Sequence, residues 1–210
     1  MPVFAVSGQT FEGVIEFSSY LSQTKDQSTV TWYTLNGNSR FEISGVADGK
    51  PYQSVLLFKK NDPNIYLLTR IGNENAVYTI PQSALTPEEQ LIGSVAVKLP
   101  ETKTIAGKQC YRIKLESSEQ TTYCWITDEL RMEEGSLPQV LRSKGIIAAL
   151  SAAGYNGLPL EVEARNDKGE VVFSYSVKNI RKMTPDTSLF TVPADYGDGT
   201  ELFLKSIKAE

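Results

Sequence analysis

Hydrophobic and polar residues alternate with a period of two over much of this chain. In one segment Tyr111, Ile113 and Leu115 alternate with Arg112 and Lys114. The same alternation recurs over residues 11–17, 40–44, 160–165 and 171–178. A strand with this pattern buries one face and leaves the other in water. These segments therefore predict half-buried β-strands.

Short polar turns separate the predicted strands. Asn36-Gly37-Asn38 has the residues of a tight hairpin turn, and Asn166-Asp167-Lys168-Gly169 links two alternating segments. Connections this short join antiparallel neighbours, because a parallel pair needs a crossover of a dozen residues or more. We expect about ten strands, which is near the size at which a sheet curls strongly.

Two capping boxes predict helices that interrupt the sheet. Thr86-Pro87-Glu88-Glu89 predicts a short helix over residues 87–92. Ser136-Leu137-Pro138-Gln139 predicts a longer helix over residues 137–152, closed by Gly154. The second half of this helix is apolar nearly all round, so it should be covered on several sides. We expect it to act as a lid over the concave face of the sheet.

The size and charge of the chain limit the classes of protein to which it can belong. The chain has 210 residues with a formal net charge of -4, and its charges of both signs are interspersed. It therefore lacks the basic footprint of a nucleic-acid binder. No apolar run approaches the roughly 20 residues that span a bilayer. No linker divides the chain, so residues 9–210 are expected to form a single β domain.

The first residues suggest export. Val3-Phe4-Ala5 has the small-residue spacing of a signal-peptidase site, although the charged and long apolar regions of a signal peptide are missing. We interpret residues 1–8 as the remnant of an export signal or a flexible N-terminus. The alternative is an ordinary apolar strand at a cytosolic N-terminus.

The composition argues against catalytic chemistry. The chain has no histidine, so it lacks the commonest general base and metal ligand, and Ser–His and Cys–His nucleophile pairs are excluded. Its two cysteines cannot build a four-ligand zinc site without carboxylates. We therefore expect no metal, no cofactor and no enzymatic activity. A Ser–Lys hydrolase remains the alternative.

A block of motifs resembles a known family. Thr104-Ile105-Ala106-Gly107-Lys108-Gln109-Cys110-Tyr111 resembles the IAGY-x-C signature of a secreted bacterial envelope family of unknown function. Cys110 matches the family cysteine, whereas Lys108 stands where that family often has an aromatic residue. Three further elements resemble the family, namely Tyr123-Cys124-Trp125-Ile126-Thr127-Asp128-Glu129-Leu130, Gly157-Leu158-Pro159-Leu160 and Leu189-Phe190-Thr191-Val192-Pro193-Ala194-Asp195-Tyr196.

The closing motif and the strand order are also similar to the LolA/LolB lipoprotein-carrier superfamily. This resemblance implies a mainly β (α+β) fold, a curved and half-open antiparallel barrel with a short helix and a longer, lid-like helix. It also implies a cavity for acyl chains, and some carriers tether their lid helices through an early-strand arginine. Arg40 stands at a comparable place, although a solvated strand arginine is the alternative.

The resemblance and the composition together predict a non-enzymatic envelope binding protein. It would hold a hydrophobic ligand, such as a lipid or a lipoprotein acyl chain, in the concave face. It would be periplasmic or secreted, with transient membrane contact and a possible protein partner. The alternative is an envelope interaction module whose core is filled and which binds no ligand.

Aromatic side chains dominate the candidate ligand site. Most aromatic residues in a β domain belong to its core, but a curved sheet of this width leaves room for a ligand. With the lid residues and Arg40, the candidates are Phe17, Trp32, Phe41, Tyr111, Trp125, Phe173, Tyr175, Val140, Ile147 and Leu150.

Cys110 and Cys124 lie on consecutive predicted strands. If a three-residue loop joins these strands, the two cysteines lie directly opposite each other, within disulfide reach. We therefore predict a structural disulfide, which would indicate an oxidising compartment. Two separate free thiols, or a redox pair, are the alternatives.

Overall fold

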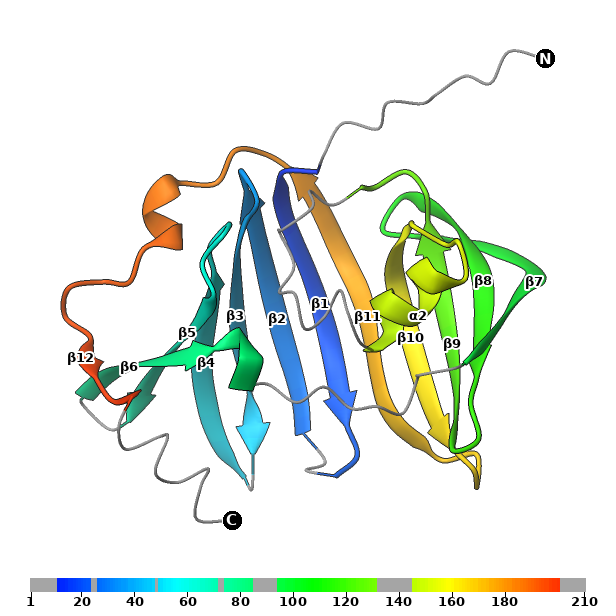
Figure 1. Cartoon of the computed structure of the whole chain (residues 1–210), viewed down its shortest axis with the longest axis horizontal. Coiled ribbons are helices and arrows are strands. Elements are labelled where there is room, and N and C mark those ends of the chain that lie inside the picture. The colour runs from blue at the N-terminus through cyan, green and yellow to red at the C-terminus, as the bar shows by residue number, and fades with distance from the viewer. Residues whose placement is uncertain are drawn as a thin grey trace.

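The computed structural model describes residues 11–23, 26–47, 49–71, 74–84, 94–131 and 145–200. Its strands form one sheet in the order β12-β6-β5-β4-β3-β2-β1-β11-β10-β9-β8-β7. Figure 1 shows this sheet as a curved wall whose two ends do not meet. The strands are β1 (Gly13–Leu21), β2 (Asp26–Leu35), β3 (Asn38–Ala47), β4 (Lys50–Phe58), β5 (Asn64–Ile71), β6 (Glu74–Pro81), β7 (Val95–Ile105), β8 (Lys108–Glu116), β9 (Gln120–Thr127), β10 (Leu158–Asn166), β11 (Val171–Lys182) and β12 (Gly197–Asp198).

Tight turns join antiparallel neighbours within the sheet, as predicted. Asn36 and Gly37 join β2 to β3 with φ values of 52° and 76°. Two left-handed residues give the turn whose twist matches that of the flanking strands. Gly169, with φ of 79°, closes the turn between β10 and β11. Long connections bring the C-terminal half back, so that β11 pairs with β1 at the centre of the sheet.

The sheet has twelve strands where about ten were expected. Two of the twelve strands show little alternation of hydrophobic and polar residues, so the sequence does not reveal them. The two residues of β12 pair with β6 in parallel, which no alternation can reveal. A register shift between Lys98 and Thr102 interrupts β7 around Pro100. The expected mainly β, curved and unclosed sheet is confirmed, and the expected strand count is wrong.

Register separates the sheet into an inner and an outer face. In β9 the side chains of Thr122, Cys124 and Ile126 are buried on the inner face. Tyr123 and Trp125 alternate with them and point to the outer face. The inner side chains of β8, β9 and β10 form a buried cluster around Ile113, Leu115, Cys124, Ile126 and Val162.

The helix α2 (Gly145–Ala152) covers this cluster on the inner face (Figure 1). Gly154 ends the helix with φ of 86°, and the Tyr155 N–H donates to the Leu150 carbonyl at 2.9 Å. A left-handed glycine with this hydrogen bond is a common helix C-terminus, as predicted for Gly154. Residues 137–144 of the predicted long helix, and the predicted helix over residues 87–92, lie outside the described residues.

Two short 3-10 helices complete the described elements, η1 (Gln82–Ala84) and η3 (Thr187–Phe190). Asp186 caps η3, because its carboxylate accepts from the Ser188 N–H at 2.8 Å. Among the described residues, no helix is long and apolar enough to cross a membrane.

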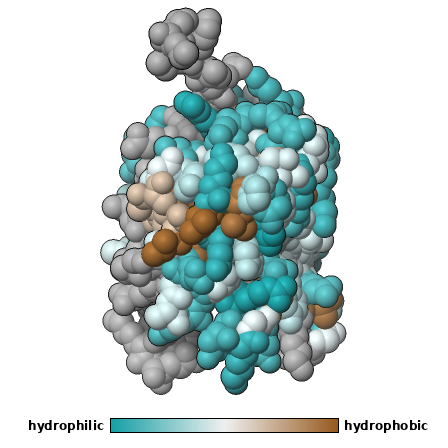
Figure 2. Space-filling view, turned by 90° about the vertical axis from the view of Figure 1, so that its right-hand side faces the viewer, coloured by the Kyte–Doolittle hydropathy of each residue, from teal (hydrophilic) through white to brown (hydrophobic). Residues whose placement is uncertain are grey.

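The strand β7 forms one free edge of the sheet. Val95 and Val97 are 64% and 44% exposed. Figure 2, which faces this side of the molecule, shows a small hydrophobic band within a mostly hydrophilic surface. Pro100 has no N–H and lies at the register shift between Lys98 and Thr102, so it interrupts this edge strand, a common feature of sheet edges.

Candidate functional site

Aromatic side chains gather on the inner face, at the strands that the sequence indicated. Trp32 stacks on Phe41 with ring centroids 5.1 Å apart, across the pairing of β2 with β3. Phe17 lies 5.7 Å from Tyr175, across the pairing of β1 with β11, and Phe173 lies 6.0 Å from Tyr175. These five candidates therefore share one face, in two groups along the sheet.

The helix α2 fills part of the space in front of this face. Leu150 is 1% exposed and packs into the buried cluster of β8, β9 and β10. Ile147 packs against a second cluster that includes Trp32 and Leu160. The candidates Ile147 and Leu150 thus belong to the packed core, whereas Val140 lies outside the described residues.

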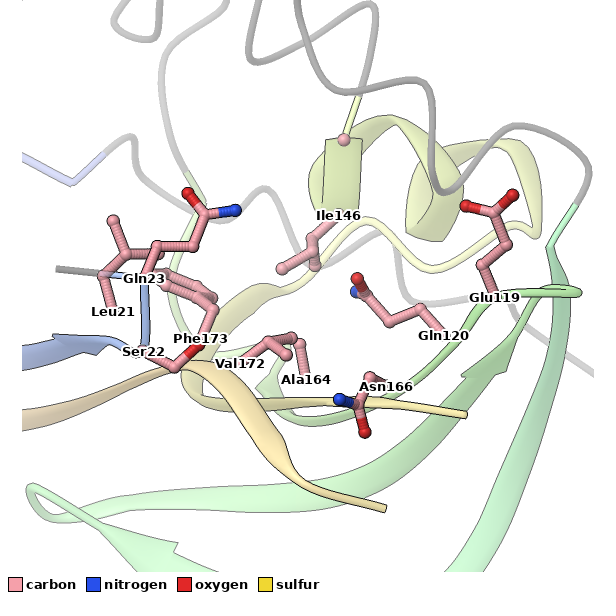
Figure 3. Close-up of a pocket in the computed structure, with 11 residues that line it drawn as sticks. Leu21, Ser22, Gln23, Glu119, Gln120, Ile146, Ala164, Asn166, Val172 and Phe173 are labelled. Atoms are coloured by element: carbon pink, nitrogen blue, oxygen red, sulfur yellow. The ribbon is translucent and has the colours of Figure 1, made fainter. Parts of the chain in front are cut away.

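Beside the start of α2 the packing leaves a cavity of about 460 Å³. Its volume falls within the roughly 300–1,000 Å³ typical of small-molecule sites. Apolar side chains from four elements surround it, namely Leu21 of β1, Ile146 of α2, Ala164 of β10, and Val172 and Phe173 of β11. Figure 3 shows Ile146 opposite Val172 and Ala164, with Leu21 and Phe173 to one side.

Polar residues lie at two sides of this cavity, Ser22 and Gln23 beside Leu21 and a second group across from them (Figure 3). Gln120 of β9 and Asn166 of β10 lie at neighbouring strand ends, with Glu119 beside them (Figure 3). The Gln120 amide donates to Thr122 Oγ1 at 2.8 Å, and the Asn166 amide donates to Glu170 at 2.9 Å. An apolar cavity with a few fixed polar groups can hold an apolar chain and contact a polar end group.

Among the predicted site residues that the structure describes, Phe173 is the one that lines the cavity. The sequence interpretation missed Leu21, Ile146, Ala164 and Val172, which are small or aliphatic. Alternation marks Leu21 and Ala164 as inward-facing, but it does not mark Ile146, which lies on a helix, or Val172, which lies at the register shift next to Phe173. Nothing local distinguishes a cavity wall from a filled core. Tyr111 lies elsewhere on the inner face, where its ring is 6.2 Å from that of Tyr155 and its hydroxyl donates to Asp128 at 3.0 Å.

Trp125 alternates to the outer face, where it is partly buried against the cluster that also contains Trp32. It pairs across the strands with Arg112, whose guanidinium lies 5.5 Å from its ring centroid. The Lys103 ammonium lies 4.3 Å above the same ring and 2.6 Å from Glu161. These cation–π and ion-pair contacts give Trp125 a structural environment on the outer surface.

Arg40 is held on the outer face by two partners. Its Nε lies 2.8 Å from Glu42, and its Nη1 donates to the carbonyl of Leu189 at 2.9 Å. Leu189 belongs to η3, so the contact fastens the C-terminal segment to β3. The predicted tether to lid helices is therefore replaced, within the described residues, by a tether to η3.

The predicted disulfide is wrong. Both cysteines are buried free thiols. The register of β8 with β9 sets Cys124 opposite Ile113, three residues from Cys110. The two cysteines are therefore not cross-strand partners, and they pack into different buried clusters. The expectation failed because the connection between these strands does not have the length that was assumed. One argument for an oxidising compartment is thereby lost.

Burial dominates the titration of the inner-face groups. It raises the pKa of the Cys124 thiol to about 12 and also raises the pKa of Tyr175, whose hydroxyl donates to the Pro159 carbonyl at 2.9 Å. Both groups therefore stay neutral near pH 7. Within the described ranges, no group of three or more Cys, Asp or Glu side chains could hold a metal ion.

Comparison with known proteins places the chain in a family. A family model described as a domain of unknown function (DUF4412) matches residues 11–196. The chain belongs to this family. The expected membership of a family of unknown function is thus confirmed. That this family is the secreted one with the IAGY-x-C motif stays a prediction. No curated protein matches the chain.

Solved structures resemble the chain in fold. An uncharacterized conserved protein from Thermus thermophilus is 8% identical with a TM-score of 0.53, covering 92% of this chain and 91% of that one. The MucA/MucB complex of Pseudomonas aeruginosa is 13% identical with a TM-score of 0.49, covering 89% of this chain and 56% of that one, so the match spans little more than half of the longer protein.

A putative outer membrane lipoprotein-sorting protein domain from Vibrio parahaemolyticus is 10% identical with a TM-score of 0.24, covering 84% of this chain and 87% of that one. Similarity at these levels of identity concerns fold alone. The resemblance to lipoprotein carriers therefore stays a prediction of the sequence.

Proposed function

We propose that this protein is a non-enzymatic binding protein of the bacterial envelope that holds an apolar chain, such as a lipid or lipoprotein acyl chain. The observation that carries the proposal is the cavity of about 460 Å³ beside α2. Its walls from β1, β10, β11 and α2 are mostly apolar, and the polar residues Gln120 and Asn166 lie at one side. Such a site favours an apolar body with a polar end.

The position of α2 supports uptake from outside the sheet. Ile146 forms a wall of the cavity, one turn before the firmly buried Leu150. Gly145 and Gly154 bracket the helix, with φ values of 82° and 86°. Gly145 can absorb backbone rotation at the start of the helix, as residues at hinge positions often do, while Gly154 and the hydrogen bond from the Tyr155 N–H to the Leu150 carbonyl fix its end. The start of the helix can thus move while its end stays anchored.

The alternative is an interaction module that binds a protein and no lipid. The open edge of β7 favours it, because an unpaired edge can accept an added strand from a partner. Val95 and Val97 are exposed along this edge. The two functions use different surfaces, so substitutions can separate them.

The test is binding of a fluorescent fatty acid by the purified chain, together with mass spectrometry of any lipid that co-purifies. Ala164→Phe should fill the cavity, because Ala164 is 2% exposed and lines it. We expect binding to weaken by roughly tenfold or more, which corresponds to about 1.4 kcal/mol. Val97→Phe is the matched control, since it adds a ring at the exposed edge and should leave fatty-acid binding unchanged.

Circular dichroism would check that both variants keep the sheet. A parent chain that carries no lipid and binds no fatty acid would contradict the proposal and favour the interaction module. Equal loss of binding in Ala164→Phe and Val97→Phe would contradict the assignment of the cavity as the site.

A further inference from the structure

The outer face carries a second hollow, of about 750 Å³, across the middle of the sheet. Five strands, β10, β11, β1, β2 and β3, contribute to it, and ten of its lining residues form two rows at right angles to the strands. One row is Glu161, Ser176, Ser18, Thr29 and Ser44, and the other is Glu163, Ser174, Tyr20, Gln27 and Val46.

Register aligns each row. Ser18 of β1 pairs with Ser176 on one side and with Thr29 on the other, and Thr29 pairs with Ser44. Neighbouring strands lie about 4.8 Å apart, so hydroxyl groups repeat at that spacing across the sheet. A row over five strands spans roughly 19 Å by the same spacing.

Short side chains create this hollow. Elsewhere the outer face carries long charged side chains in pairs, such as Arg181 with Glu16 at 2.6 Å and Arg112 with Glu101 at 3.0 Å. In the first row the three central strands carry only serine and threonine. Because these residues lack the bulk of the surrounding ion pairs, the face is hollow where the hydroxyl groups stand.

Several of these polar groups have hydrogen-bonding capacity to spare. Thr29 Oγ1 and Ser44 Oγ bond each other at 2.9 Å, which leaves further acceptor sites on both. Within the described part of the chain, the side chains of Ser18, Tyr20 and Ser174 make no hydrogen bond. A hydroxyl can both donate and accept, so this surface suits a ligand that does the same.

Charge excludes one class of occupant. The lining residues of the hollow include Glu161 and Glu163 and no lysine or arginine. Both carboxylates are paired, Glu161 with Lys103 at 2.6 Å and Glu163 with Arg165 at 2.7 Å. Anionic polymers, including nucleic acids, would meet these carboxylates and no lysine or arginine among the lining residues, although the Lys178 ammonium donates to Ser176 Oγ at 3.5 Å. An apolar partner would find few apolar side chains, chiefly Tyr20 and Val46.

We infer that this hollow is a binding site for an uncharged polysaccharide, lying across the strands along the two rows. A glycan chain presents hydroxyl groups at regular intervals and carries no net charge, so it matches the repeated hydroxyls, the length of the row and a lining whose two carboxylates are already paired. The site lies on the face opposite the acyl-chain cavity and does not depend on the proposed function.

The experiment is native affinity electrophoresis and titration calorimetry with cellohexaose, chitohexaose and dextran, with heparin as the polyanionic comparison. At least one neutral glycan should bind, and heparin should not. The double variant Ser18→Val/Thr29→Val removes two central hydroxyls while keeping residues that favour strands. Its affinity should fall roughly tenfold or more, about 1.4 kcal/mol.

Thr31→Val is the matched control, because Thr31 lies on the same face of β2, outside the hollow. It should bind the glycan like the parent, and all variants should take up the fluorescent fatty acid as before. Ser18→Lys, which places a long side chain in the hollow, should abolish glycan binding. The inference is overturned if no neutral glycan binds, if heparin binds more tightly, or if the double variant binds like the parent.

Discussion

At the scale of single residues, the two cysteines show how an environment sets reactivity. Cys124 is fully buried among Ile113, Ile126 and Val162, and burial raises its pKa to about 12. Burial also raises the pKa of Cys110. A thiolate is the reactive form, so both thiols should be inert in the folded protein.

We therefore predict that the folded chain shows no fast reaction with a thiol reagent at pH 8, whereas the chain in denaturant shows two reactive thiols without any reductant. The measurement is absorbance after addition of a chromogenic disulfide reagent. Failure to detect thiols in denaturant would mean that the cysteines are oxidised and would contradict the register of β8 with β9.

Arg40 gives a second residue-scale prediction. Its side chain is 14% exposed and bonds both Glu42 and the Leu189 carbonyl. Arg40→Met should lower the free energy of unfolding by roughly 1.5–3 kcal/mol, the range for hydrogen bonds to charged groups. Urea denaturation would measure it. Arg181→Met is the control, since this exposed arginine should contribute less than about 1 kcal/mol.

Trp125 marks the limit of residue-level prediction from the sequence. Aromatic character suggested the inner face, but Cys124 and Trp125 are neighbours on one strand, and only one of them can point inward. The small residues Thr122 and Cys124 are buried there, while the indole is covered by Lys103 and Arg112. Hydrophobicity alone therefore predicts the wrong inward-facing residues in a strand that buries its small side chains and covers its aromatic side chains with cations.

At the scale of elements, α2 combines anchoring with formation of the cavity. Leu150 is buried in the core of the sheet, and Ile146 lines the cavity. The sequence predicted the helix, its apolar character and its end at Gly154, because each rests on local chemistry. It did not separate the anchoring residues from the wall of the cavity, since that depends on which strand each side chain meets.

The two roles can be tested by truncation. Leu150→Ala should destabilise the protein by about 2–5 kcal/mol, because it leaves a hole in a packed cluster. Ile146→Ala should cost less, because one side of Ile146 already faces empty space. It should also enlarge the site and shift binding toward longer or bulkier acyl chains. Thermal unfolding and a series of fatty acids would measure the two effects, and a larger cost for Ile146→Ala would contradict this division.

The strands illustrate the same division between local and non-local information. Alternation predicted β8, β10 and β11, and the turn at Asn36 and Gly37 predicted the hairpin of β2 with β3. The pairing of β1 with β11 depends on contacts across most of the chain. The rows of hydroxyls on the outer face arise from that pairing, so they cannot be recognised in any single segment.

At the scale of the whole molecule, one sheet presents two chemically different surfaces. The inner face carries α2 and the aliphatic cavity, and the outer face carries ion pairs and the hollow of hydroxyls. Because β1, β10 and β11 contribute to both, each strand has an apolar and a polar binding side. Period-two alternation is thus enough to place two unlike sites back to back.

The inner face also sets how the molecule responds to alkali. The pKa of Cys124 is raised to about 12, and those of Tyr175 and Tyr111 are raised above their usual value of 10.0, with burial as the largest cause in each case. The folded state therefore holds these protons more tightly than the unfolded chain. Their contribution to stability is complete below the unfolded-state pKa values and is lost as pH rises through them toward the folded-state values.

We predict that the free energy of unfolding falls steadily from about pH 9 upward, where unfolded thiols and phenols begin to ionise. Tyr175→Phe removes one of these protons and should make the decline shallower, although losing the bond to the Pro159 carbonyl lowers stability at pH 7. Phe173→Leu, which changes a neighbouring ring of the inner face that has no hydroxyl, is the control and should retain the parent slope. Urea denaturation at a series of pH values would measure the slopes. A Tyr175→Phe slope equal to that of the parent would show that this hydroxyl does not couple folding to pH.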